Sequence, residues 1–98
     1  MLDINILKTR YFEIKLGNLT LDVEPPKVKV LKKVMAVTKT KNENTMEELA
    51  EVVGLILNKN KTKCTVTDDV IDELDLDQLN EILTAFFEWL GRTKDSKN

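Results

Sequence analysis

Hydrophobic and polar residues alternate from Phe12 to Val23, and only Gly17-Asn18 interrupts the alternation. Two alternating runs joined by a two-residue turn predict a β-hairpin in which Leu16 lies opposite Leu19. That register gathers on one face the apolar side chains of both strands, namely Phe12, Ile14, Leu16, Leu19, Leu21 and Val23. Because an isolated hairpin is at best marginally stable in water, we expect helices of the chain or another protein to cover this face.

The hydrophobic spacing changes to that of helices after Pro25-Pro26. Pro26 suits the first helical position, where its missing N–H costs nothing, and the helix is predicted to end near Lys39. Its apolar stripe, opposite a face of lysines, contains Val28, Leu31, Val34, Met35 and Thr38, widened by Val30 and Val37. Lys27 to Val30 also alternates as a strand does, so the sequence leaves open whether this segment is partly strand.

A capping-box pattern at Thr45 and Glu48 predicts a second helix that ends near Asn58. One face of this helix carries Met46, Leu49, Val52, Val53, Ile56 and Leu57. Leu55 projects from the polar side. A polar and basic stretch then breaks the helix, and residues 64–66 are predicted to form a brief extended piece.

Acidic residues mark the starts of two further helices. Thr67 or Asp68 begins a short helix that runs to Leu74, and the Asp75-to-Gln78 spacing is a second capping box. The helix that follows is predicted to end near Gly91, which suits a C-cap. Its apolar residues cover an arc of roughly 160°, wider than the 100° or so that packing on one side requires: Leu76, Leu79, Ile82, Leu83, Phe86, Phe87, Trp89 and Leu90.

These elements predict one domain over residues 1–98, with an α+β fold that is mainly helical: an N-terminal β-hairpin packed with three to four α-helices. A chain of this length is long enough to bury one hydrophobic core. Residues 1–10 form either a short strand or a loose arm, and residues 92–98 are predicted to be a flexible tail.

Charge divides unevenly along the chain. Residues 1–41 carry nine Lys and Arg against four Asp and Glu, whereas residues 42–98 carry six against thirteen. The balances of +5 and −7 give the net charge of −2. The two halves either neutralise each other within one fold or favour head-to-tail contact between copies. The second alternative predicts self-association.

The side chains needed for most catalysis and metal binding are missing. The chain has no histidine, its three glycines are isolated, and its acidic residues between 68 and 77 lack the spacing of a calcium-binding loop. We therefore expect no enzyme activity, no cofactor and no metal site. The net acidic charge argues against a nucleic-acid partner. The single cysteine, the lack of a signal-peptide pattern and the lack of a membrane-spanning run predict a cytoplasmic protein without a membrane partner.

The order of elements resembles a known family. An early hairpin, a proline-marked helix, a capped middle helix and the acidic segment from Val66 to Leu83 lead into Phe86-Phe87-Glu88-Trp89. In this order, which spans roughly residues 11–90, the chain resembles the tail assembly chaperones of long-tailed bacteriophages and prophages, particularly those of Gram-positive hosts.

The resemblance implies a non-enzymatic protein of the bacterial host cytoplasm that works without ATP. Such a chaperone binds the tape measure protein, keeps it soluble and promotes assembly of the tail tube protein around it, and it is not expected in the mature virion. Many relatives also have a longer form, made by a ribosomal frameshift, whose extension contacts the tube protein. The protein sequence does not show whether this chain has one.

The candidate partner-binding residues are Phe86, Phe87, Trp89 and Leu90 of the last helix, which has apolar surface to spare, together with Leu55 of the second helix. A small intracellular interaction or regulatory module is the alternative function. Such an adaptor or antitoxin-like protein would use the same aromatic helix to bind one folded partner.

Overall fold

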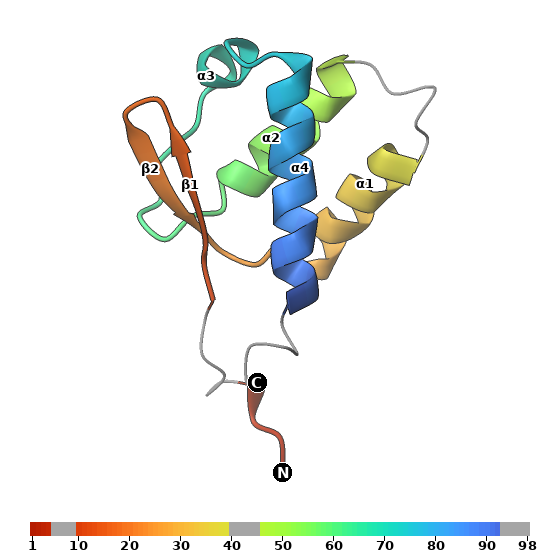
Figure 1. Cartoon of the computed structure of the whole chain (residues 1–98). Helices are drawn as coiled ribbons and strands as arrows, with labels where there is room; N and C mark the ends of the chain where they lie inside the picture. The colour runs from red at the N-terminus through yellow and green to blue at the C-terminus, as the bar shows by residue number, and fades with distance from the viewer. Residues whose placement is uncertain (5–9, 40–45, 93–98) are drawn as a thin grey trace.

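A computed structural model describes residues 1–4, 10–39 and 46–92 of the chain. Strands β1 (Phe12–Leu16) and β2 (Leu19–Val23) are followed by helices α1 (Val28–Lys39), α2 (Met46–Leu57), α3 (Asp68–Asp72) and α4 (Leu76–Gly91). In Figure 1 the hairpin stands on one side of α4 and α1 on the other, while α2 passes behind α4. This arrangement confirms the predicted mainly helical α+β fold.

The hairpin has the predicted register. Leu16 pairs with Leu19 and Phe12 with Val23, in an antiparallel two-stranded sheet. Gly17 takes a positive φ of 58°, which a glycine at the first position of a type II′ turn adopts without strain. The alternation therefore places the apolar side chains of both strands on the face that turns toward the helices.

The proline-marked helix begins later than the sequence predicts. Leu31 N–H donates to the Lys27 carbonyl, and α1 starts at Val28 rather than at Pro26. Glu24 N–H still bonds to the Lys59 carbonyl, so the chain remains extended beyond β2 before it turns into the helix. The segment after Lys27 is helix and not strand.

The caps of the later helices follow the local sequence. Thr67 caps α3, and the Asp75 side chain accepts from Gln78 N–H while Gln78 Oε1 accepts from Asp75 N–H, which forms the predicted capping box of α4. The predicted capping box at Thr45 lies outside the described residues, as do residues 5–9 of the arm and the tail after Arg92. Gly91 is helical, and Arg92 takes the C-cap in its place.

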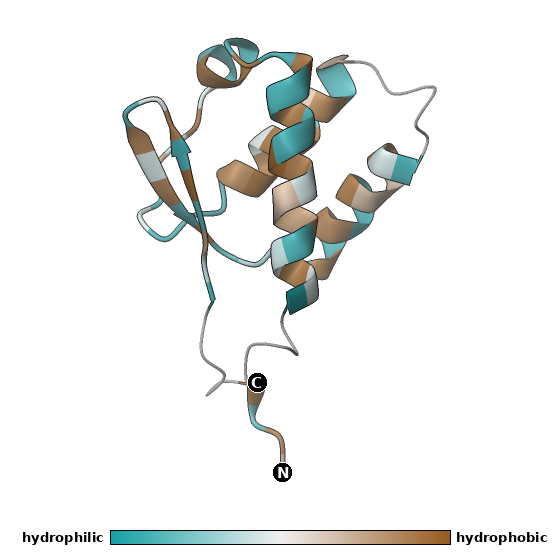
Figure 2. Cartoon of the chain, in the orientation of Figure 1, coloured by the Kyte–Doolittle hydropathy of each residue, from teal (hydrophilic) through white to brown (hydrophobic). Residues whose placement is uncertain are grey.

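The core lies where β2, α2 and α4 meet. Its fully buried members include Leu21, Val23, Val52, Ile56, Leu79 and Phe86. Figure 2 shows apolar residues on the sides of the elements that face each other and polar residues along the front of α4. By contrast α1 buries only Val34. Two residues of its predicted stripe stay exposed, Val28 at 67% and Met35 at 43%.

Asparagine side chains hold the connection from α2 to α3 through hydrogen bonds to its backbone. Asn60 is 2% exposed, and its side chain donates to the carbonyls of Leu57 and Cys64 and accepts from Cys64 N–H. Asn60 also forms an isolated bridge with Val23 of β2. Residues 64–66 join no strand of the sheet, because the N–H groups of Cys64 and Val66 bond to asparagine side chains, and the brief extended piece stays a prediction.

Candidate functional site

The aromatic end of α4 packs into the fold. Phe86 has no exposed surface, and Phe12 crosses it edge-to-face with the ring centroids 5.8 Å apart. Phe12 reaches this position because the hairpin register turns it inward. A side chain sealed in this way has no surface for a partner, so the expectation that Phe86 contributes to a partner contact is corrected.

The other candidates at this end are partly covered. Trp89 lies 5.8 Å from both Phe12 and Phe86, measured between ring centroids, and the Arg10 guanidinium sits 4.5 Å from the centre of the Trp89 ring. Arg10 Nη1 also donates to the Trp89 carbonyl at 3.1 Å. Phe87 and Leu90 are half-buried against the core. The spare apolar surface of α4 is therefore smaller than its arc indicates.

Leu55 lies apart from these residues, on the outer face of α2. It lines a groove of about 730 Å³ between α2 and α3, which we call the α2 groove: Glu47, Ala50, Glu51, Gly54, Leu55, Asn58, Lys59, Asp68, Ile71 and Asp72. None of the α4 candidates belongs to this lining. A second, smaller hollow of about 130 Å³ shares Ala50 with the groove and is lined further by Met46, Leu74 and Leu79. The open surface thus follows the whole of α2, about 18 Å for a helix of this length.

Small residues form the middle of the α2 groove. Ala50 and Gly54 are four residues apart and so lie on the same side of the helix. The exposed Leu55 follows Gly54 directly, and the exposed Met46 lies about one turn before Ala50. A Cβ built on Gly54 meets no atom within 4 Å. The fold itself therefore gives no steric reason for a glycine in the interior of α2, where it costs stability relative to alanine.

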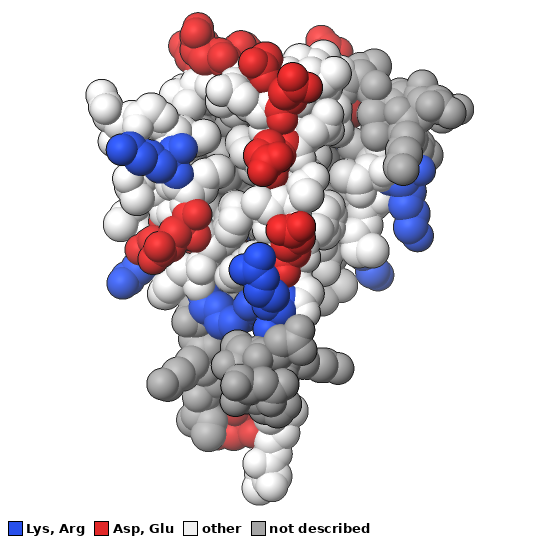
Figure 3. Space-filling model, in the orientation of Figure 1, with Lys and Arg blue, Asp and Glu red and all other residues white. Residues whose placement is uncertain are grey.

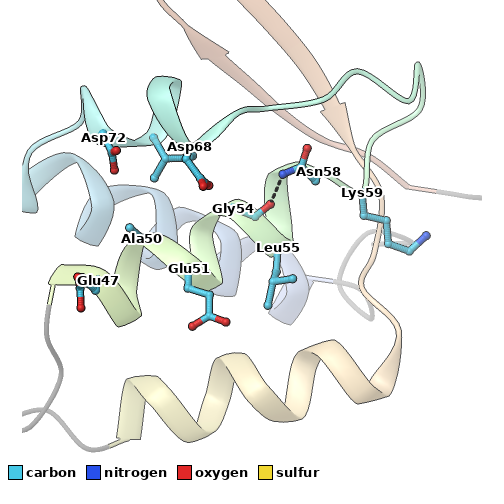
Figure 4. A pocket seen from close by; sticks show the side chains of 10 residues that line it. Glu47, Ala50, Glu51, Gly54, Leu55, Asn58, Lys59, Asp68 and Asp72 are labelled. Atoms are coloured by element: carbon cyan, nitrogen blue, oxygen red, sulfur yellow. Dashed lines mark hydrogen bonds between the residues drawn. The ribbon is translucent and has the colours of Figure 1, made fainter.

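The rim of the groove is acidic. Figure 4 shows Asp68 and Asp72 reaching from α3 toward α2, and Glu51 and Leu55 pointing toward the side on which α1 lies. Glu51 bonds to Lys33 of α1 at 2.8 Å, and Lys59 to Glu24 at 3.0 Å. Within the described ranges, no salt bridge involves Glu47, Asp68 or Asp72. The space-filling view in Figure 3 also shows acidic side chains gathered over α3 and down the front of α4.

The α2 groove offers a ligand both charge and apolar surface. The groove lining holds carboxylates, one lysine, one asparagine and apolar groups, without a histidine, cysteine or hydroxyl that could act as a nucleophile. In the part of the chain that the structure describes, no three side chains of His, Cys, Asp or Glu are grouped to hold a metal ion. No described helix combines the length and apolar character needed to cross a membrane.

Comparison with protein-family models, curated proteins and solved structures finds no match to this chain. The predicted membership of the tail assembly chaperones stays a prediction. The sequence pointed to Leu55 as a stray leucine on a polar helix face, but it gave no sign of the groove, because the placement of α3 creates it. The spacing of Ala50 and Gly54 is the signal that could have indicated this face.

Proposed function

We propose that this protein is a non-enzymatic assembly chaperone that holds a helical segment of its client in the α2 groove. The observation that carries the proposal is a groove along α2 that combines apolar and acidic side chains, with a glycine in the middle that the fold does not require. A helix laid in such a groove can bring its backbone close to α2 at the small residues and pack its larger side chains between Met46 and Leu55.

Charge defines the client segment further. The rim carries Glu47, Asp68 and Asp72 without a basic partner among the described residues, so a helix with lysine or arginine beside its apolar stripe fits better than an acidic one. Such complementarity raises the rate of association and excludes like-charged helices. An apolar and basic amphipathic helix is therefore the ligand class that the groove favours.

The resemblance supplies the identity of the client. On this proposal the chain binds the tape measure protein of a long-tailed phage in the host cytoplasm, keeps its helical segments soluble, promotes tail tube assembly around it and leaves before the virion is complete. The groove along α2 supports this role because it provides apolar surface to shield a client helix and acidic surface to keep the complex soluble.

The direct test measures binding of a synthetic amphipathic helix to the purified protein. A peptide with leucine and alanine on one face and lysine on the other should bind, and the same peptide with glutamate in place of lysine should bind much more weakly. Leu55→Asp should weaken binding at least tenfold, because it replaces the exposed apolar side chain of the groove with a charge. Equal binding of the lysine and glutamate peptides would contradict the proposal.

Leu76→Asp is the matched control, because Leu76 is also an exposed leucine but lies outside the groove, in the first turn of α4. It should bind the lysine peptide as the wild type does. In bacteria that also express the tape measure protein of the same genome, Leu55→Asp should lower the soluble yield of the client and Leu76→Asp should not. A client that stays equally soluble with both variants would remove the tape measure assignment.

The alternative of an adaptor or antitoxin-like module relied on the aromatic end of α4. Phe86 is buried there, and Arg10 and Phe12 lie against Trp89, so little of that end is open to a folded partner. This packing favours the chaperone proposal with the α2 groove as its binding surface.

A further inference from the structure

The outer edge of β1 is open in the described part of the chain. β2 has further backbone partners beyond β1, because Glu24 N–H bonds to the Lys59 carbonyl and Lys61 N–H to the Asp22 carbonyl. Among the described residues, β1 is paired on one side alone, with β2. On its other side it borders a groove of about 370 Å³ whose far wall belongs to α4 and the turn before it. A paired strand with a free edge is a template for another strand.

The register decides which backbone groups point out from this edge. In a hairpin with a two-residue turn the pair next to the turn, Leu16 and Leu19, is hydrogen-bonded, and bonded and non-bonded pairs then alternate. Glu13 and Lys15 therefore belong to non-bonded pairs. Their N–H and C=O groups point away from β2, toward the open groove.

Within one copy, the apolar side chains of β1 are not fully buried, and Glu13 has no basic residue opposite it. Phe12, Ile14 and Leu16 are only half-buried, whereas Leu21 and Val23 of β2 are buried. On the polar face Glu13 stands opposite Asp22, so the hairpin pairs two carboxylates and gives Glu13 no opposite charge. Like charges directly opposite each other destabilise a sheet.

We propose that two copies of this chain pair through β1, antiparallel and centred on Ile14. This register sets Glu13 of each copy opposite Lys15 of the other and Phe12 opposite Leu16 of the other, with the two Ile14 side chains together on the apolar face. Glu13 and Lys15 are the residues whose backbone groups face outward, so each such pair forms the hydrogen bonds of an antiparallel ladder. The two hairpins become one four-stranded sheet.

The neighbouring registers lack this match. Centring the pair on Glu13 brings the two glutamates face to face, and centring it on Lys15 brings the two lysines face to face. A register shifted by one residue turns the apolar faces of the two hairpins to opposite sides. Only the register about Ile14 combines hydrogen bonding, apolar contact and opposite charges, and a foreign strand has no reason to carry the same pattern. This inference does not depend on the α2 groove or on its client.

Charge reversal tests the pairing without touching the core. The wild type should sediment at twice the mass of the 11.2 kDa chain in an analytical ultracentrifuge at low ionic strength. Glu13→Lys and Lys15→Glu should each raise the dimer dissociation constant by roughly tenfold or more, because each substitution acts twice across the two-fold axis. An equimolar mixture of the two variants should form a heterodimer, and the double variant should regain the homodimer.

Lys29→Glu is the control, because it changes the net charge as Lys15→Glu does but lies on the exposed face of α1. It should leave the dimer intact. Glu13→Lys also places a lysine opposite Asp22, so loss of the dimer does not follow from a weaker hairpin. A wild type that is monomeric throughout, single variants that dimerise as the wild type does, or a mixture that stays monomeric would each overturn the proposal.

Discussion

The aromatic end of α4 and the α2 groove differ in how far the chain covers its own apolar surface. At the aromatic end, Phe12 comes from the distant hairpin to close over Phe86 and Trp89. Along the outer face of α2, a Cβ built on Gly54 meets no atom within 4 Å, and Leu55 keeps 36% of its surface exposed. The aromatic residues of α4 thus belong to the core, while the small residues of α2 lie at an open surface.

This difference teaches that the width of an apolar arc is a poor measure of binding surface. α4 needs its wide arc because it packs on α2 and also against Phe12 of the hairpin, whereas α2 contacts α1, α3, α4 and β2 and still leaves Leu55 at the surface. Apolar residues that pack between two neighbours are structural, and the surface left for a partner is the one that the fold does not fill.

Phe86→Ala should show the largest effect of any substitution in either region. Truncation of a fully buried phenylalanine removes its apolar contacts and leaves a cavity. We therefore expect the free energy of unfolding to fall by about 3–5 kcal/mol. Urea denaturation followed by circular dichroism measures the change. Phe87→Ala is the matched control, and its loss should be clearly smaller, because Phe87 is only half-buried. Equal losses would mean that Phe86 is not the centre of this packing.

Removal of the Arg10 guanidinium that lies over Trp89 should change the free energy of unfolding less than Phe86→Ala does. Arg10→Ala loses both the stacking on the indole and the hydrogen bond to the Trp89 carbonyl, and the free energy of unfolding should fall by about 1 kcal/mol. Trp89 is the only tryptophan, so its fluorescence reports on this site alone, and the emission maximum should move to longer wavelength. Arg10→Lys keeps the positive charge but loses the planar group that stacks on the indole, and its emission maximum should shift less than that of Arg10→Ala. An unchanged emission maximum in Arg10→Ala would show that Arg10 does not cover the ring.

Local patterns predicted the parts of this fold whose geometry is local. The two-residue turn and the alternation around it give the pairing of Leu16 with Leu19, and the Asp75-to-Gln78 spacing gives the α4 cap. Both depend on residues close in sequence, whose backbone and side-chain geometry restricts the outcome. The role of Asn60 was missed because its partners form a loop closure that no periodic pattern describes.

The candidate site was predicted less well, because it depends on tertiary placement. Leu55 was found because a leucine on a polar helix face is visible in the sequence, but Phe86 was assigned to the surface because the arc of α4 does not reveal that Phe12 covers it. The α2 groove exists because α3 lies beside α2 and brings Asp68 and Asp72 to its rim. No residue of α2 alone carries that information.

Gly54→Ala should produce the smallest change and the most informative one, because it is expected to move stability and binding in opposite directions. The added methyl group meets no atom of the fold, so the variant should be more stable by about 0.5–1 kcal/mol through the helix preference of alanine. The same methyl group stands where a docked helix would approach, so binding of the lysine peptide should weaken. Ala50→Gly is the reciprocal control and should be less stable while it keeps its affinity. A Gly54→Ala variant that is more stable and binds the peptide as tightly as the wild type would show that no helix contacts this part of α2.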